Sequence, residues 1–313
     1  MKVFVFGWYG QGNLGDEAFK ESFIKLWPNN KFTFSNSIPT NINEIYDACW
    51  IGGGSFLEQH IPNLEYVNIP ISFFGVGSSL SPSSSVRGAL EKAEHIVFRD
   101  KTAAECWPKA KVLSDLVFAR EDLIPLPMAK KKQVTIFLND FLTPFGKVME
   151  WKALSYYWYL QEFTKIIDRL SATHKIVLFP MCINHRVDDR RIAGSLIGRS
   201  EFPHRYEWIL EHQDEYTLRK CIQESEFVIT QRFHGLVYSL IAEVPCVTIT
   251  AHDKFASLCR HLQLPLVDFY GITDASFGKA MGDLGSFMSD RVIEYRKESI
   301  LKWKTMADLV NGF

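Results

Sequence analysis

The chain has 313 residues, of which 47% are hydrophobic and 23% are charged, so it is long enough for two globular domains. The formal net charge of −1 argues against a protein that binds nucleic acid through a general basic surplus. No stretch is apolar over the roughly 20 residues that a membrane-spanning helix needs, so we expect at most peripheral contact with a membrane. The six cysteines form no Cys-x-x-Cys pair and no secretory signal precedes them. This favours reduced thiols in a cytoplasmic protein, free or at the inner face of the membrane.

The first 120 residues alternate short apolar runs with helical stretches. The apolar runs predict strands at 3–6, 32–34, 48–51, 71–74, 95–98 and 111–113, with helices over 17–26 and 84–94. Short, continuously apolar strands separated by helices indicate a parallel sheet that is covered on both faces. In such a sheet the ligand crevice lies outside the carboxyl ends of the strands.

Two prolines and a basic run interrupt this pattern over residues 121–133, which we interpret as a linker. Alternation then restarts, with strands predicted at 134–138, 176–179, 227–230 and 247–250 and helices over 150–171 and 290–311. We therefore predict an α/β protein of two Rossmann-like domains that face a cleft, with domain bounds 1–125 and 126–313.

A glycine-rich turn over residues 7–17, GWYGQGNLGDE, matches the dinucleotide fingerprint G-x-G-x-x-G after the first strand. A nicotinamide or flavin enzyme would also need an acid at the end of the second strand, where 34–36 reads Phe-Ser-Asn. Asp16 and Glu17 would moreover repel a pyrophosphate. Two interpretations remain: Asp16 caps the helix that follows, or Asn13, Asp16 and Glu17 line the cleft and bind sugar hydroxyls.

The segment Arg232-Phe233-His234-Gly235 follows a predicted strand and opens a helix. Arginine offers a planar fork of donors that fits a carboxylate or a phosphate, and histidine exchanges a proton near neutral pH. A helix start adds positive potential, so the segment predicts an anion pocket beside a proton donor. The alternative is that Arg232 pairs structurally with an acid and that His234 only packs or caps.

Further polar side chains follow other predicted strands. They are Lys254, the group Asn184, His185, Asp188 and Asp189 after Pro180, and, in the first half, Arg99-Asp100 and Asp115. Polar groups gathered at adjacent strand ends are what a site needs, although each of those in the first half alone also fits a surface ion pair. The histidines lack metal-ligand spacing and no Gly-x-Ser-x-Gly elbow occurs, so we expect neither a metal site nor a serine hydrolase.

Taken in order, these motifs resemble the polysaccharide pyruvyl transferase family. The matching features are the turn GWYGQGNLGDEAF, Gly52-Gly53-Gly54-Ser55, Gly75-Val76-Gly77, Arg99-Asp100, Asp115, Pro180 with Asp188, Arg232-Phe233-His234 and His252-Asp253-Lys254. The family often has leucine where Phe233 stands and tyrosine where His252 stands, and its Arg-Asp motif usually continues to a serine that is missing here.

The resemblance implies a GT-B-like fold and transfer of a pyruvyl group from phosphoenolpyruvate, without a cofactor, to hydroxyls of a sugar in a polysaccharide or glycolipid precursor. Domain 1–125 would hold the acceptor and domain 126–313 the donor. The implied catalytic residues are His234, as general acid, Arg232 and Asp16. The implied donor contacts are Arg99, Arg232, Lys254 and Gly235, and the acceptor contacts are Asn13, Asp16, Glu17, Gly53, Gly54 and Ser55. The rival interpretations are a GT-B glycosyltransferase with a nucleotide-sugar donor and a non-catalytic glycan-binding protein.

Overall fold

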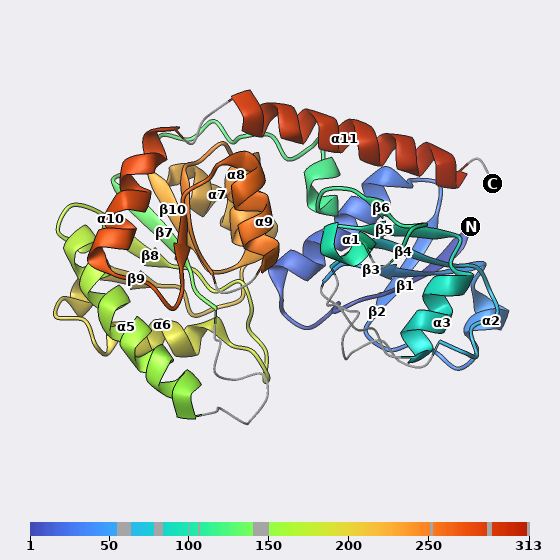
Figure 1. Ribbon diagram of the computed structural model, residues 1–313, viewed down its shortest axis with the longest axis horizontal. Coiled ribbons are helices and arrows are strands. Elements are labelled where there is room, and N and C mark those ends of the chain that lie inside the picture. Colours follow the sequence, from blue (N-terminus) through green and yellow to red (C-terminus); the bar gives the residue numbers. More distant parts are fainter. Residues whose placement is uncertain are drawn as a thin grey trace. The chain divides into compact units, whose positions relative to one another are not determined.

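A computed structural model describes residues 1–54, 64–77, 84–99, 101–105, 107–139, 150–250, 253–286 and 290–311 (Figure 1). Its contacts divide the chain into two compact units. Unit 1 comprises Met1–Asp122 and Glu294–Phe313, and unit 2 comprises Leu123–Ile293. The division falls just before the predicted boundary of 125/126. The prediction that the second domain runs to residue 313 differs from this division, because the terminal segment is counted with unit 1.

The reason is the packing of α11 (Asp290–Asn311), the last helix. Trp303 is fully buried, and its indole Nε1 donates a hydrogen bond to the carbonyl oxygen of Ser114 at 3.1 Å. The ring of Tyr295 stands edge-on to that of Phe118, with centroids 5.3 Å apart. These partners are nearly 200 residues away along the chain, so no local pattern could have indicated them.

Unit 1 is built around a six-stranded parallel sheet in the order β2-β1-β3-β4-β5-β6. Its elements are β1 (Lys2–Phe6), α1 (Leu14–Leu26), β2 (Lys31–Ser35), α2 (Ile42–Ile45), β3 (Ala48–Gly52), β4 (Ile71–Val76), α3 (Ser84–Lys92), β5 (His95–Phe98), α4 (Lys101–Glu105), β6 (Lys111–Val112) and the 3₁₀ helix η1 (Leu116–Ala119). The chain leaves β1 toward one edge of the sheet and β3 toward the other. The strand order therefore reverses between β1 and β3, which is where ligands bind in open α/β sheets.

Unit 2 holds a second six-stranded parallel sheet, in the order β12-β11-β10-β7-β8-β9. Its elements are β7 (Gln133–Phe137), α5 (Glu150–Ser171), β8 (Lys175–Leu178), α6 (Asp189–Ile197), η2 (Pro203–Arg205), β9 (Tyr206–Trp208), α7 (Glu215–Glu224), β10 (Phe227–Thr230), α8 (Phe233–Ile241), β11 (Cys246–Thr250), α9 (Asp253–Leu262), β12 (Leu266–Asp268), α10 (Asp274–Gly282) and η3 (Asp283–Ser286). This is the strand order of a dinucleotide-type Rossmann sheet, with its reversal between β7 and β10.

The two sheets confirm the predicted pair of Rossmann-like halves, but two strands were missed. β9 and β12 are three residues each and lie at the two edges of the second sheet, where most of their residues are exposed or half-buried. An edge strand needs no continuous apolar run, because one of its sides faces no neighbouring strand. The inner strands, such as β4 and β7, are buried at every position, which is why their apolar runs were visible in the sequence.

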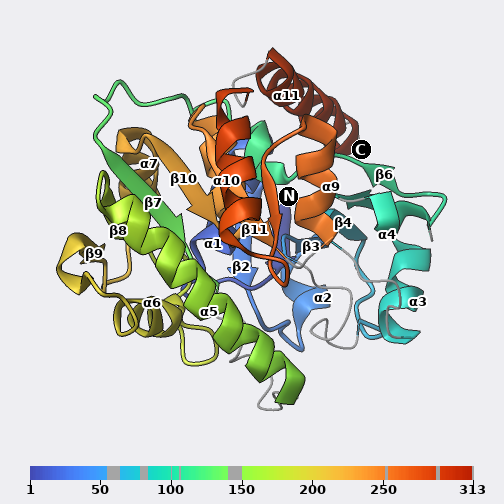
Figure 2. The same cartoon turned by 60° about the vertical axis from the view of Figure 1, so that its left-hand side comes forward.

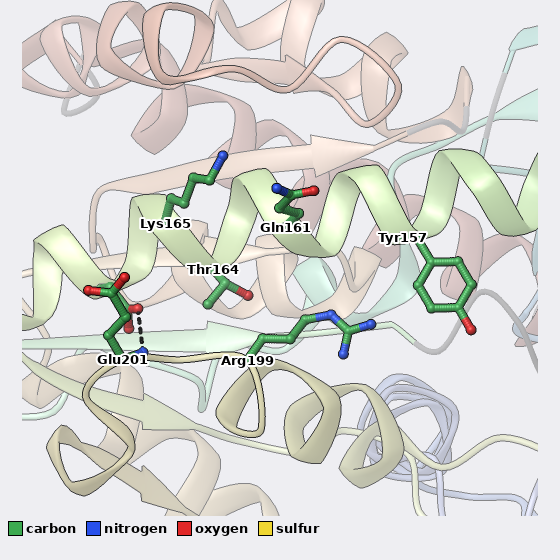
Figure 3. Close-up of a pocket in the computed structure, with 7 residues that line it drawn as sticks. Tyr157, Gln161, Thr164, Lys165, Arg199 and Glu201 are labelled. Atoms are coloured by element: carbon green, nitrogen blue, oxygen red, sulfur yellow. Dashed lines mark hydrogen bonds between the residues drawn. The ribbon is translucent and has the colours of Figure 1, made fainter.

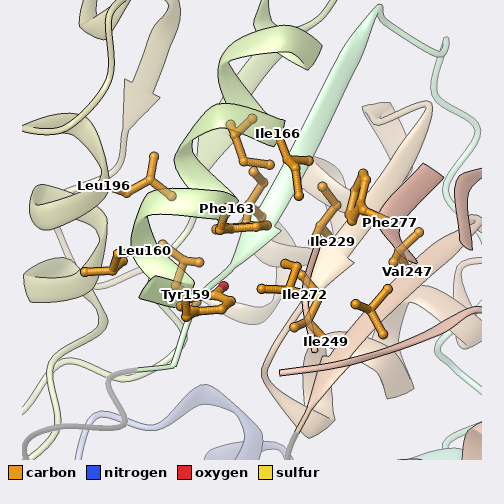
Figure 4. Close-up of a cluster of buried hydrophobic side chains, with 14 of the residues drawn as sticks. Tyr159, Leu160, Phe163, Ile166, Leu196, Ile229, Val247, Ile249, Ile272 and Phe277 are labelled. Carbon is orange, nitrogen blue, oxygen red and sulfur yellow. The ribbon is translucent and has the colours of Figure 1, made fainter. Parts of the chain in front are cut away.

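Helices cover both faces of the sheet in unit 2. On one face α5 lies between α6 and α10, while α7 packs beside α8 on the other (Figure 2). The core beneath α5 joins Tyr159, Phe163 and Ile166 to the inward side chains of β10 and β11 (Figure 4). In unit 1 the face under α1 is aromatic, and its buried rings Trp27, Trp50 and Phe74 lie within about 5 Å of one another by centroid. Much of the high aromatic content is therefore core packing.

Candidate active site

The Arg232 segment lies at the strand reversal of unit 2, in the turn between β10 and α8. Thr230 fixes this turn, because its hydroxyl Oγ1 accepts a hydrogen bond from the Arg232 amide at 3.0 Å and donates one to the Arg232 carbonyl at 2.8 Å. Gln231 ties the turn to β7: its amide donates to the Phe137 carbonyl at 2.7 Å, and its side-chain oxygen accepts from the Asn139 amide at 3.0 Å. The carboxyl ends of β7 and β10 are thereby held as one platform.

Arg232 forms an ion pair with Asp189. Its Nε donates to Asp189 Oδ2 at 3.0 Å and its Nη2 to Oδ1, so one edge of the guanidinium fork faces the carboxylate. The Asp189 side chain is 1% exposed and that of Arg232 is 16% exposed. The structure thus confirms the alternative in which Arg232 pairs with an acid. It leaves the prediction of an anion pocket untested, since a guanidinium carries five donors and one carboxylate faces only one edge.

The two adjacent aspartates at the start of α6, Asp188 and Asp189, make different contacts. Asp188 is the N-cap: its Oδ1 accepts from the Arg190 amide at 3.0 Å, and the Arg190 guanidinium holds its pKa below the ordinary value. Asp189 points inward, where Oδ2 also accepts from the amides of Met181 and Cys182 at 3.1 and 3.0 Å. Burial raises the pKa of Asp189, against the opposing pull of Arg232 and the two amides.

His234 and Gly235 follow in the first turn of α8. His234 is buried, and its ring meets that of Phe233 edge-on with centroids 5.8 Å apart. A β-carbon on Gly235 would lie 2.4 Å from Thr230 Oγ1 and 2.8 Å from the Phe137 ring. Glycine is therefore required here so that the helix can start close against β10 and β7. The predicted contact of Gly235 with a donor remains a prediction beside this packing role.

In unit 1 the glycine-rich turn lies at the corresponding strand reversal, and its polar residues bind one another. Asn13, not Asp16, is the N-cap of α1, because its Oδ1 accepts from the Gly15 amide at 3.1 Å. Its side-chain amide then donates to Asp16 Oδ2 at 2.6 Å, which orients this buried carboxylate. The interpretation of Asp16 as the cap is wrong, because the capping position lies three residues earlier, at Asn13.

Glu17, in the first helical turns of α1, contacts the glycine-rich turn through its carboxylate. Its Oε1 accepts from the Gly10 amide at 2.6 Å, and Oε2 forms an ion pair with Lys20. In a dinucleotide fold the amides of this turn face a pyrophosphate, whereas here a carboxylate of the protein already takes one of them. Burial, followed by the charges of Asp16 and Glu17, raises the pKa of Tyr9, whose hydroxyl donates to the Gly52 carbonyl at 2.9 Å. The turn is thus acidic and does not form an anion cradle.

Gly53 and Gly54 follow β3 with φ of +78° and +73°, a left-handed conformation that favours glycine. A β-carbon on Gly53 would also come within 3.0 Å of the buried Phe19 ring of α1. Arg99, at the end of β5, forms an ion pair with Asp115 at 2.9 Å, and the two side chains are 4% and 0% exposed. The alternative of a surface ion pair is right about the pairing and wrong about the exposure, since both side chains are buried and Asp115 also caps the buried helix η1.

The matching sequence model is that of the polysaccharide pyruvyl transferases, and it covers residues 9–253. The chain belongs to the polysaccharide pyruvyl transferase family. The match includes both strand reversals and confirms the resemblance of the ordered motifs. The chain is therefore an enzyme of the pyruvyl transferase kind.

Solved structures show the fold of this pyruvyl transferase. It is similar to a UDP-GlcNAc 2-epimerase from Neisseria meningitidis, with 11% identity and a TM-score of 0.64 over 99% of each chain. A putative UDP-N-acetylglucosamine 2-epimerase from Listeria monocytogenes, at 11% identity, gives a TM-score of 0.58 over 96% of this chain and 90% of that one. MurG from Acinetobacter baumannii, also at 11% identity, gives 0.50 over 100% and 99%. These are GT-B-type enzymes, which confirms the predicted fold class; at such low identity they indicate nothing about function.

The structure therefore gathers several predicted residues of this pyruvyl transferase at the strand reversal of each unit, whereas Arg99 lies after β5, away from the reversal between β1 and β3. Arg232, His234 and Gly235 meet in unit 2, and the residues that meet in unit 1 are Asn13, Asp16, Glu17, Gly53 and Gly54. Ser55, Asp100 and His252 lie outside the described residues, as does the Lys254 side chain, whose backbone is in the first turn of α9. Within the described ranges no three histidine, cysteine or acidic side chains are arranged to hold a metal, and no helix has the length and apolarity to cross a membrane.

Two residues of this site were missed as such in the sequence. Asp189 was noted only as one of several polar groups after Pro180, and its pairing with Arg232 depends on α6 and α8 starting at the same edge of the sheet. Gln231 was passed over, although a polar residue directly after a buried strand is the position from which a side chain reaches the neighbouring strand end. Its Nε2 donates to the Tyr159 hydroxyl at 2.5 Å, which also ties the platform to α5.

Proposed function

We propose that this enzyme transfers a pyruvyl group from phosphoenolpyruvate, without a cofactor, to two hydroxyls of a sugar in a polysaccharide or glycolipid precursor. The observation that carries the proposal is the turn after β10, where Arg232 is oriented by a buried carboxylate and His234 follows two residues later. The turn thus places a fixed cation beside a proton donor. It lies at the strand reversal, which is where a Rossmann sheet binds its ligand.

The donor brings a carboxylate and a phosphate, so its binding needs fixed cations. Asp189 holds the plane of the Arg232 guanidinium through Nε and Nη2, and a preset fork loses less freedom when it binds a second acceptor. The start of α8 adds positive potential at the same point. We therefore assign the donor first to Arg232. Lys254 and Gly235 are further proposed contacts, and so is Arg99, for which the buried pair with Asp115 gives less support.

The reaction then balances as follows. His234 gives a proton to the methylene carbon of the donor, and the adjacent carbon becomes an oxocarbenium-like centre that a first sugar hydroxyl attacks. The C–O bond to phosphate breaks, and a second hydroxyl attacks the same carbon to close the ketal. Each hydroxyl loses one proton: one restores His234 and the other leaves with phosphate or solvent. Asp16, oriented by Asn13, is the group that we propose for positioning the acceptor hydroxyls, with Glu17, Gly53, Gly54 and Ser55 around them.

The test incubates the purified protein and a panel of saccharides with phosphoenolpyruvate or with UDP-sugars. The proposal expects phosphate release that depends on the saccharide, together with a product whose mass has grown by one pyruvyl ketal. Nucleotide release without phosphate release would support the glycosyltransferase instead, and saccharide binding with neither would support a non-catalytic glycan-binding protein.

The role of His234 is tested by His234→Ala and His234→Gln in the same assay. Removing a general acid should lower turnover by roughly 10²–10⁴-fold. Glutamine keeps the side-chain volume in this buried position, so an unchanged unfolding midpoint for His234→Gln shows that lost turnover is not lost folding. Turnover near that of the wild type in a folded variant removes His234 from the mechanism.

A further inference from the structure

A groove of about 350 Å³ lies along α5 and is lined by residues other than those of the candidate site (Figure 3). Along the helix it is lined by Tyr157, Gln161, Thr164 and Lys165, which are spaced about one helical turn apart. Its other wall is the segment after α6, from which Arg199 and Glu201 project. The proposed mechanism uses none of these residues.

The floor of the groove is polar and fixed. Asp168 is buried, and its carboxylate accepts from Ser200 Oγ at 2.5 Å, from the Tyr206 hydroxyl at 2.6 Å and from the Glu201 amide at 3.0 Å. These bonds hold the segment after α6 against α5. Thr164 is also buried, and its hydroxyl donates to the Leu160 carbonyl at 2.6 Å. The groove is thus preformed, which lowers the cost of ordering it when a ligand binds.

The walls offer an aromatic ring beside mixed polar groups. Tyr157 is 58% exposed, and the Arg199 guanidinium carbon lies 5.6 Å from its ring centroid, which helps to hold the ring in place. Gln161 both donates and accepts, Lys165 donates, and Glu201 accepts. The lining has two cations, Lys165 and Arg199, and two carboxylates, Asp168 and Glu201, so its formal charge is zero.

This chemistry fits an uncharged, polyhydroxylated ligand. Sugar hydroxyls both donate and accept, and the C–H face of a sugar ring packs on an exposed aromatic ring. A phosphate or a nucleotide would need a surplus of cations, which the groove lacks. We propose that the groove is an outlying carbohydrate subsite that binds neutral sugar residues of the acceptor chain other than those that receive the pyruvyl group. The link to the acceptor rests on the proposed function, whereas saccharide binding itself does not.

The test measures binding without any donor. Neutral oligosaccharides of glucose, galactose, mannose and N-acetylglucosamine, in increasing length, are titrated calorimetrically into the wild type, Tyr157→Ala and Tyr216→Ala. Tyr216 is the matched control, since it is 57% exposed on α7 of the same unit. We expect at least one neutral series to bind the wild type and Tyr216→Ala alike, and Tyr157→Ala to bind about 3- to 10-fold more weakly, the range for one aromatic contact.

Equal affinities for the two variants, or no binding of any neutral series by the wild type, would each overturn the subsite. A failure of pyruvyl transfer would not, because phosphate release is measured separately. Where transfer is observed, Tyr157→Ala should raise KM for a long acceptor while kcat and the KM for a monosaccharide acceptor stay unchanged. A purely structural role for Tyr157 would not separate long acceptors from short ones.

Discussion

Asp189→Asn keeps the shape of the side chain that contacts Arg232 but removes its charge. Asparagine resembles the protonated acid: its oxygen still accepts from the amides of Met181 and Cys182, while its NH₂ group faces the Arg232 Nη2 donor. Arg232 therefore keeps the acceptor of its Nε, which is the same oxygen, but loses the acceptor of its Nη2 and the negative charge, so its plane is held less firmly. A loosened arginine must be ordered again when the donor binds, at a cost of up to about 1.5–2 kcal/mol, which corresponds to an increase of up to roughly 10- to 30-fold in the KM for phosphoenolpyruvate.

The same substitution should cost stability, and more at low pH than at neutral pH. Burial raises the pKa of Asp189, so the unfolded chain ionises first as the pH rises above the ordinary value of 3.8, while the folded chain keeps its proton until the raised pKa is passed. The wild type therefore loses stability over this window and Asp189→Asn does not. At neutral pH the variant should be less stable than the wild type by about 1–3 kcal/mol, because removing one partner of a buried pair takes the carboxylate from the Arg232 charge and sets two donors against each other.

The assays are the KM for phosphoenolpyruvate, from initial rates of phosphate release, and urea unfolding at neutral pH and below pH 3.8. Asp188→Asn is the control, since it removes the neighbouring carboxylate, which contacts Arg190 and not Arg232. An unchanged or lower KM in Asp189→Asn would refute the orienting role, because it would mean that the carboxylate merely neutralises the charge that attracts the donor. A stability difference between the wild type and Asp189→Asn that does not widen from neutral pH to below pH 3.8 would refute the account of burial.

Three further substitutions follow from the same contacts. Arg232→Lys should raise the KM for the donor, because an ammonium cannot present a two-pronged fork; an unchanged KM would remove Arg232 from donor binding. Asp188→Asn retains the cap but loses the ion pair with Arg190, so it should lower the free energy of unfolding by about 0.2–1 kcal/mol at neutral pH. The difference from the wild type should disappear as the pH falls below 3.8 through the lowered pKa of Asp188. A difference that stays constant with pH in urea unfolding would contradict this. Gly235→Ala should lower the free energy of unfolding by about 1–3 kcal/mol, because the added β-carbon overpacks the start of α8. Gly278→Ala in α10, where a β-carbon meets nothing within 4 Å, should raise it by up to about 1 kcal/mol. Equal unfolding midpoints for the two variants would show that the crowding at Gly235 relaxes without cost.

Some glycines in the motifs of this protein have structural roles that do not depend on a ligand. Gly53 turns the chain in a left-handed conformation beside Phe19, and Gly235 lets α8 begin against Thr230 and Phe137. In the glycine-rich turn over residues 7–17, the Gly10 amide donates a hydrogen bond to the Glu17 carboxylate. A fingerprint that matches a dinucleotide site letter by letter thus serves a different turn, in which the helix supplies its own carboxylate.

The sequence by itself determined the inner strands and the long helices. A strand buried on both faces is mostly apolar along its length, so β1, β3, β4, β7 and β10 could be located from that pattern. Helices of 22 residues, such as α5, carry enough apolar turns to be recognised with their bounds. The motifs at the ends of these strands could then be assigned to sheet edges, because the carboxyl ends of parallel strands share one edge.

Only the tertiary structure decided the partners. The edge strands β9 and β12 are short and partly exposed, so their pairing depends on neighbours and not on composition. The contacts of Trp303 in α11 join it to unit 1, and the pairing of Asp189 with Arg232 joins two helix starts that are 43 residues apart. A local pattern records which face of a segment is buried, but not which distant group covers it. The predicted site at Arg232 and His234 is therefore sharpened by a residue that the pattern alone could not choose, the second of two adjacent aspartates.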